Sequence, residues 1–290
     1  MTYTAWIILT ASLVGLSCGL IGVFLILRKM AMMSDAISHT VLLGIVVAYM
    51  ITREVSGTAM LIGAILAGLL TAFLVQWLHS LDIQQEASMG IVFTTLFAIG
   101  VILISTSVGN VHLDVQHALM GEITFIPWDT MSLPLIGEVP KATALLFAVF
   151  IVVLFFILIF YKEWKILSFD PALAAILGIP VLVMHYLFMG LVSITTVASF
   201  DAVGAIMVVA MLITPASSAY LWTDKLSFML ILSSLFGVTS AVVGYYIAAW
   251  IDTSISGSMA FATGLIFLIS FIFSPKHGMV AKYLRPPEAH

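Results

Sequence analysis

Residues 5–44 read AWIILTASLVGLSCGLIGVFLILRKMAMMSDAISHTVLLG. The part before Arg28 has no charged residue and is long enough for a helix to cross about 30 Å of hydrocarbon. Arg28 and Lys29 follow it, and a second apolar run begins after them. Asp35 and His39 stand at the head of this second run, four residues apart and therefore on one face of a helix. The stretch predicts two membrane helices joined by a basic turn, with an ionisable pair on the second.

The rest of the chain has the same apolar character. Of its 290 residues, 62% are hydrophobic and 8% are charged, whereas a soluble domain carries about 25% charged residues. No segment alternates apolar and polar residues as outer-membrane strands do. We therefore expect an all-α fold, a polytopic membrane bundle of eight or nine helices in a single domain over 1–290. The nine spans are expected at about 5–27, 36–52, 58–78, 88–108, 142–161, 180–198, 203–222, 226–250 and 258–274. Eight crossings remain if one of the shorter spans is re-entrant.

The basic residues predict an orientation. If the turn at Arg28 is cytoplasmic, alternation of nine spans leaves only Arg53 and Lys141 outside among the ten basic residues. By the positive-inside rule the N-terminus then faces out and the C-terminus faces the cytoplasm. The net charge of −4 is small and scattered, so the chain offers no basic surface for nucleic acid.

Two segments between spans are long enough to matter. The outer one, 109–141, contains His112, Asp114 and His117 and suits a lid or short, partly buried helices. The inner one contains a predicted cytoplasmic helix at about 168–179. Ser168 or Asp170 is a candidate N-cap, Pro171 lies in the first turn, and Gly178 with Pro180 ends the helix.

Asp35 and His39 are the main candidate metal ligands. An isolated charge in hydrocarbon costs at least about 2.5 kcal/mol, so an ionisable pair there needs a partner or a function. Carboxylate and imidazole together suit Mn²⁺, Zn²⁺ or Fe²⁺. The alternative is that Ser34 or Asp35 caps the second span and His39 bonds within the bundle. Asp201 is a further candidate for metal passage, or a helix cap near the outer surface. His185 is either a pore ligand or a neutral histidine bonded to a carbonyl.

Four motifs resemble the membrane permeases of bacterial ATP-driven manganese, zinc and iron importers. They are 34–39 with Gly44, 169–178, 200–215 and 274–278, in this order along the chain. The resemblance implies a type II ABC importer-like permease in the bacterial cell membrane. It also implies a second permease copy, most simply in a homodimer, a cytoplasmic ATPase subunit and an extracytoplasmic metal-binding protein. The chain has no G-x-x-x-x-G-K-[ST] motif, so it is not expected to be an enzyme, and a separate chain would hydrolyse ATP.

The resemblance also assigns roles. Mn²⁺ would be the cargo, with zinc or iron as the alternative, and no cofactor would be bound permanently. Less favoured alternatives are a cobalamin or metal-chelate permease, a gradient-driven metal transporter and an intramembrane metalloenzyme. The inner helix would receive the ATPase stroke, with Phe169, Leu173 and Leu177 as docking side chains. The residues matching the family there are Asp170, Pro171, Ala174 and Gly178. A simple interfacial helix is the other reading of this segment.

Overall fold

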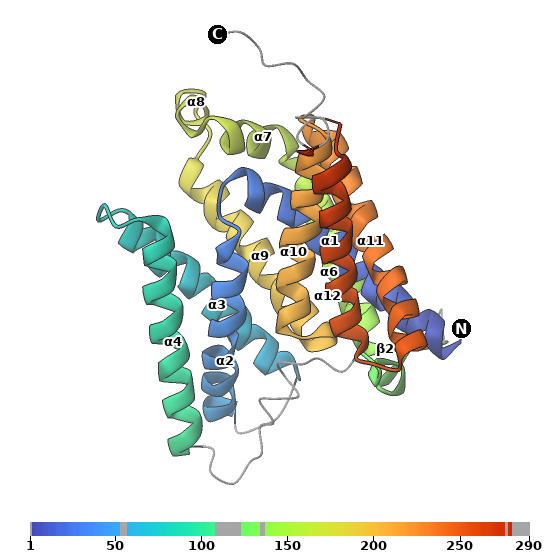
Figure 1. Ribbon diagram of the computed structural model, residues 1–290. Helices are drawn as coiled ribbons and strands as arrows, with labels where there is room; N and C mark the ends of the chain where they lie inside the picture. Colours follow the sequence, from blue (N-terminus) through green and yellow to red (C-terminus); the bar gives the residue numbers. More distant parts are fainter. Residues whose placement is uncertain (1, 53–56, 108–122, 134–136, 276–277, 280–290) are drawn as a thin grey trace.

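The computed structural model describes residues 2–52, 57–107, 123–133, 137–275 and 278–279. Within these residues, nine helices are long and apolar enough to cross a membrane (Figure 1). They are α1 (Tyr3–Leu27), α2 (Met32–Thr52), α3 (Gly57–His79), α4 (Gln85–Ser107), α6 (Lys141–Ile159), α9 (Val181–Val203), α10 (Ala205–Trp222), α11 (Leu226–Ile251) and α12 (Ile255–Phe273). The predicted spans and the helical bundle are confirmed, and the alternative of eight crossings is not needed for these residues.

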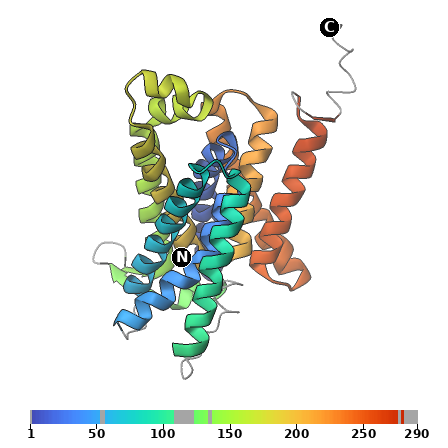
Figure 2. The ribbon, with the colours of Figure 1, turned by 90° about the vertical axis from the view of Figure 1, so that its left-hand side faces the viewer.

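The spanning helices form two groups. Helices α2, α3 and α4 pack against one another, and α1, α6, α10, α11 and α12 form the second group. Helix α9 contacts α3 and α2 on one side and α6 and α1 on the other, so it joins the groups. Figure 1 shows α2, α3 and α4 on the left, and Figure 2 shows the same helices from the side.

Glycines allow several of these helices to approach closely. A Cβ atom added to Gly15 of α1 would lie 2.6 Å from the carbonyl carbon of Gly237 on α11. Gly44 of α2 and Gly63 of α3 face each other in the same way. Lipid tails are as apolar as the side chains, so close backbone packing is what holds membrane helices together.

One end of the bundle carries two short helices, α7 (Tyr161–Phe169) and α8 (Pro171–Ile176). They lie at the top of Figure 1. Asp170 separates them and accepts a hydrogen bond of 2.9 Å from the Leu173 amide, with Pro171 in the first turn of α8. Gly178 follows with a φ of 78°. The predicted cap and stop signals are therefore confirmed. Helix α8 covers six residues within the expected range of 168–179, and a separate helix α7, which we did not expect, ends just before the extended cap residue Asp170 at φ −146°.

The opposite end carries a small hairpin. After a 3-10 turn η1 (Ile126–Trp128), strands β1 (Thr130–Leu133) and β2 (Gly137–Pro140) pair antiparallel, with Thr130 opposite Pro140. The Lys141 ammonium lies 2.6 Å from the Asp129 carboxylate, and the Tyr3 hydroxyl donates to the Thr124 carbonyl. The described part of the outer segment is thus a hairpin and not the short helices we expected. The residues 108–122 lie outside the described part of the chain.

Candidate metal site

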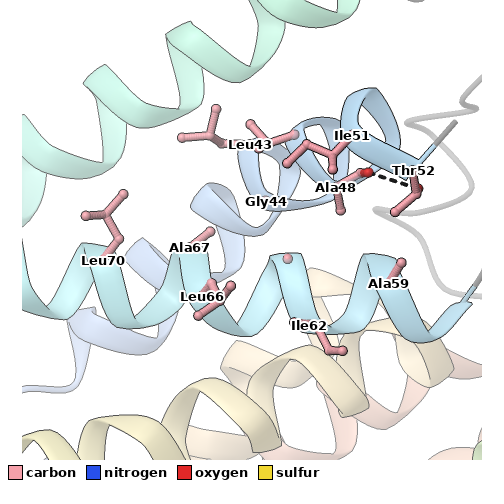
Figure 3. A pocket seen from close by; sticks show the side chains of 12 residues that line it. Leu43, Gly44, Ala48, Ile51, Thr52, Ala59, Ile62, Leu66, Ala67 and Leu70 are labelled. Carbon is pink, nitrogen blue, oxygen red and sulfur yellow. Dashed lines mark hydrogen bonds between the residues drawn. The ribbon is translucent and has the colours of Figure 1, made fainter.

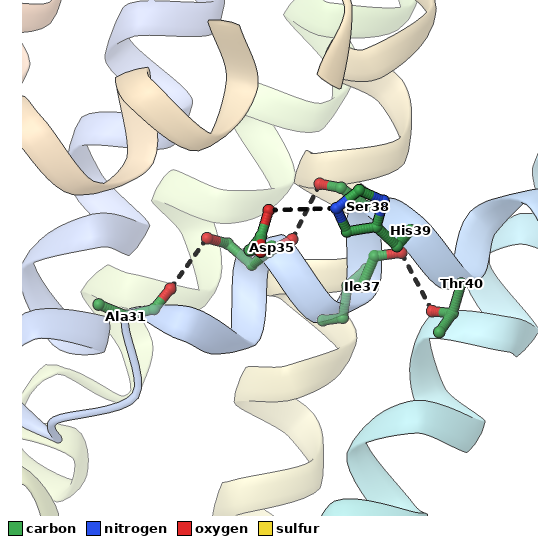
Figure 4. A network of polar contacts seen from close by, with 7 residues as sticks. Ala31, Asp35, Ile37, Ser38, His39 and Thr40 are labelled. Carbon is green, nitrogen blue, oxygen red and sulfur yellow. Dashed lines mark hydrogen bonds and ion pairs between the residues drawn. The ribbon is translucent and has the colours of Figure 1, made fainter. Parts of the chain in front are cut away.

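The candidate site is built on the first two turns of α2. Asp35 lies in the first turn and His39 one turn further on, so both side chains project from one face (Figure 4). His39 Nε2 is 3.6 Å from Asp35 Oδ1, and the two side chains are 38% and 33% exposed. That distance is too long for a hydrogen bond. The two groups face each other without closing the gap between them.

Neither side chain has a hydrogen bond within the residues that the structure describes. In the described part of the chain, no backbone N–H donates to the Asp35 carboxylate. The Ser34 hydroxyl donates to the Ala31 carbonyl at 3.0 Å, and α2 begins at Met32, so both Ser34 and Asp35 lie within its first turn and not at its cap position. The capping alternative for Ser34 and Asp35 therefore has no support in the contacts.

Two phenylalanines of α4 hold the imidazole. The ring of Phe93 stacks on His39 with centroids 5.5 Å apart and an angle of 26° between the planes. Phe97, one turn later, meets the same ring edge-on at 5.7 Å. Because Phe93 and Phe97 are four residues apart, the sequence places both on one face of a helix. Nothing in the sequence shows that this face of α4 lies against α2.

Hydroxyl groups anchor α2 behind the site. The Thr71 hydroxyl of α3 donates to the Thr40 hydroxyl at 2.7 Å, and both side chains are fully buried. Ser38 donates to the Ser34 carbonyl at 2.8 Å within α2. The bond between Thr71 and Thr40 connects α3 to α2 beside His39. It fixes how α2 is rotated and therefore the direction in which the imidazole projects.

The pair is a partial metal site. Nitrogen and oxygen ligands at about 2.0–2.2 Å from one ion lie about 3.0–3.4 Å apart, so the observed 3.6 Å needs little adjustment. No group of three or more His, Cys, Asp or Glu side chains comes together in the described residues. Asp35 and His39 thus supply two ligands, and water or another chain would supply the rest.

The other candidates lie elsewhere. Asp201 is in the last turn of α9, and the cap position of α10 belongs to Gly204, whose φ is 84°. The side chain of Asp201 lies outside the described residues, as do His112, Asp114 and His117. His185 lines a cavity with Arg28 and Lys29, where two cationic side chains disfavour a metal ion. Of these candidates, His185 has a described side chain, and it lines this cavity, which does not include Asp35 or His39.

A groove between α2 and α3 offers no ligands. It encloses about 410 Å³ between Leu43, Ala48, Ile51, Ile62 and Leu70 (Figure 3). Its hydroxyl group, on Thr52, donates to the Ala48 carbonyl at 3.0 Å. This apolar groove is unsuited to a cation.

The inner segment exposes apolar side chains. Phe169, Leu173, Ile176 and Leu177 are 58%, 44%, 82% and 58% exposed, while Ala174 is fully buried beneath them. Four large apolar side chains on two short helices form a surface of the kind that binds another protein or the membrane interface.

The fold is that of a polytopic membrane protein, and α2 carries a partly exposed ionisable pair, Asp35 and His39. Comparison with known proteins then gives the family: residues 1–274 match the ABC 3 transport family, and the chain belongs to it. It is 57% identical to the manganese transport system membrane protein MntD of Bacillus subtilis, over 98% of this chain and 97% of that protein. It is 41% identical to the zinc transport system membrane protein TroD of Treponema pallidum, over 97% of this chain and 77% of that protein.

A solved structure has the same fold. PsaBC from Streptococcus pneumoniae, in complex with Fab, superposes with a TM-score of 0.79 at 34% identity, covering 96% of this chain and 94% of that one. The resemblance inferred from four motifs is thus confirmed over nearly the whole chain. The chain is a multi-pass membrane subunit of an ABC transporter.

Proposed function

We propose that this chain is the permease of an ATP-driven importer that carries Mn²⁺ across the cell membrane. The observation that carries the proposal is the Asp35 and His39 pair, which faces one direction, is half exposed and has no competing backbone hydrogen bond. Its relatives include proteins named for manganese and for zinc transport, and the donor set binds either metal. Manganese is preferred because the relative with 57% identity bears that name.

Few protein ligands suit a transport site. An ion that must leave at each cycle cannot be held by a complete, tight shell. Two ligands from this chain leave positions for water or for the same pair of a second permease copy. We propose a homodimer in which the faces carrying Asp35 and His39 line a shared pathway. Asp201 would act near the outer approach, at the end of α9.

The ATPase would dock on α7 and α8. The exposed apolar side chains Phe169, Leu173 and Leu177 would contact it, and Asp170, Pro171 and Gly178 would hold the shape of the segment. Ala174 would act from below by packing α8 onto the bundle. In this arrangement the end with α7 and α8 is cytoplasmic, so the N-terminus faces out, where an extracytoplasmic metal-binding protein would dock. Arg28, Lys29, Lys162, Lys165 and Lys225 lie at or beside the span ends on the α7 and α8 side, so the positive-inside rule supports a cytoplasmic assignment of this end.

The test is metal accumulation in proteoliposomes that contain this chain with its ATPase and metal-binding protein. Asp35→Asn and His39→Ala should each lower Mn²⁺ uptake at least about tenfold, because each removes one of two ligands. Assembly with the ATPase and basal ATP hydrolysis should stay at wild-type levels. A matched control is Asp252→Asn, which changes an exposed carboxylate at the end of α11.

Either result is informative. Full-rate uptake by both variants would refute the pair as the cation site and would direct the search to Asp201 and residues 109–122. Zinc uptake measured in the same vesicles decides the cargo, because a higher kcat/KM for Zn²⁺ than for Mn²⁺ would reverse our preference.

A further inference from the structure

The cavity that His185 lines with Arg28 and Lys29 lies at the end of the bundle that carries α7 and α8. It encloses about 550 Å³ and does not include Asp35 or His39. The polar side chains that line it are Arg28, Lys29, Gln76, His79, Gln85, Ser168 and His185, and the Ser168 hydroxyl already donates to the Trp164 carbonyl. No Asp or Glu is among the described residues that line it. The cavity is therefore rich in donors and carries at least two positive charges.

Arg28 forms the charged floor of this cavity. It follows the last residue of α1, and its Cζ atom lies 5.0 Å from the centroid of the Phe188 ring on α9. Its Nη1 atom is buried and has no hydrogen-bond partner within the described residues. Burial lowers the pKa of the guanidinium to about 10, so it remains charged at neutral pH.

Among the residues that the structure describes, this cation has no carboxylate partner. No Asp or Glu carboxylate in the described segments lies within 4.0 Å of the Arg28 guanidinium. Leaving a buried charge without a partner is strongly unfavourable. Lys29 at the exposed rim adds a second cationic donor, whereas the Nδ1 atom of His79 is already bonded to the Ile83 carbonyl at 3.0 Å. The arrangement requires an anion that accepts several hydrogen bonds at once, as a phosphate group does.

The position of the cavity indicates where the phosphate comes from. The cavity lies where four spans end or begin, at Leu27, His79, Gln85 and Val181, which is the level of the lipid headgroups in one leaflet. Leu182 lines it and is 60% exposed, and Trp77 beside Gln76 is 54% exposed. An apolar residue and an indole at this depth are suited to acyl chains and to the membrane interface.

We propose that this cavity binds the phosphate group of an anionic phospholipid, with Arg28 as the main contact and Lys29 at the rim. The exposed apolar neighbours favour a lipid over an acidic side chain of a protein partner. Bound there, the lipid would bridge the α1–α2 turn, the end of α3 and the start of α9. The proposal does not depend on the transported metal, nor on which side of the membrane this end faces.

The test uses the purified full-length chain in detergent. Native mass spectrometry measures the affinity for phosphatidylglycerol and phosphatidylcholine, and thermal unfolding is followed with each lipid and with inorganic phosphate. Wild type should prefer phosphatidylglycerol. Arg28→Gln should weaken phosphatidylglycerol binding about tenfold or more, and Lys29→Gln about fivefold. Lys225→Gln is the matched control, because Lys225 is exposed at the same end and does not line the cavity.

Lys29→Gln, at the exposed rim of the cavity, still tests the proposal if Arg28→Gln does not fold. Equal affinities of the wild type for the two lipids would overturn the proposal. So would unchanged phosphatidylglycerol binding in Lys29→Gln, and in Arg28→Gln if that variant folds. Stabilisation by inorganic phosphate equal to that by phosphatidylglycerol would replace the lipid with a free anion. Unchanged lipid binding with loss of ATPase assembly in Arg28→Gln would instead assign the cavity to an acidic side chain of the ATPase.

Discussion

His39 depends on its neighbours for its orientation. Its ring is 3.6 Å from Asp35 on one side and is bounded by Phe93 and Phe97 of α4 on the other. The two rings restrict rotation of the imidazole without donating or accepting hydrogen bonds. The Nε2 atom of His39 therefore stays available to an ion, while the plane of the imidazole ring keeps its orientation.

Phe93→Ala should lower the affinity for the metal more than the turnover. Loss of the stacked ring removes an aromatic contact of about 0.5–1.5 kcal/mol, which corresponds to a rise in KM of about two- to twelvefold. Phe93→Tyr keeps the stacking and should restore the wild-type KM. Initial rates of uptake over a range of Mn²⁺ concentrations measure both quantities.

The control for this prediction is Phe147→Ala, which removes an exposed phenylalanine from α6. Its KM should not change. A fall in kcat at constant KM in Phe93→Ala would contradict a positioning role and would indicate a role in the conformational step.

At the scale of elements, helix crossings are set by small residues. Gly15 of α1 faces Gly237 of α11, where a Cβ atom would overlap the opposing backbone. Gly15→Val should separate the two helices and lower the midpoint of thermal unfolding in detergent by several degrees, since overpacking costs about 1–3 kcal/mol.

Gly264→Ala in α12 is the matched substitution, because a Cβ atom there meets nothing within 4 Å. It should be neutral or slightly stabilising, as alanine is the better helix former by about 1 kcal/mol. Equal midpoints for Gly15→Val and wild type would show that this crossing does not hold the bundle together.

The spans were predictable because each is a long apolar run, and a membrane helix must satisfy its hydrogen bonds internally. Asp170 as a cap was predictable because a short polar side chain before Pro171 competes for the first amides. The break of the inner segment into α7 and α8 was not predictable, because the sequence of residues 161–169 fits an interfacial loop as well as it fits a helix. The Phe93 and Phe97 contacts with His39 depend on how α4 packs on α2, which no local pattern specifies.

On the scale of the whole molecule, the proposed coupling connects an ATPase bound at α7 and α8 with Asp35 and His39 in the group of helices α2 to α4. Asp170 holds α8 through its bond to the Leu173 amide. Asp170→Ala should remove a cap worth about 1 kcal/mol and loosen α8. We expect less Mn²⁺ transported per ATP hydrolysed, with the ATPase still assembled.

Asp170→Ser supplies another capping side chain and should retain most of the coupling. Transport and phosphate release measured in the same proteoliposomes give the ratio directly. An unchanged ratio in Asp170→Ala would show that α8 does not transmit the stroke, even if the ATPase binds there.

The junction at Gly204 has a consequence for how α9 moves. Helix α9 has 23 residues, hence a length of about 34 Å, and a short link over residues 177–180 joins it to α8. Gly204 is the one residue between α9 and α10, and its φ of 84° suits glycine alone. With no loop to absorb displacement, a tilt imposed on α9 at the α8 end swings its far end, including the backbone of Asp201, about a single pivot. If α8 receives the ATPase stroke as proposed, α9 would transmit the displacement across the thickness of the membrane as one rigid element.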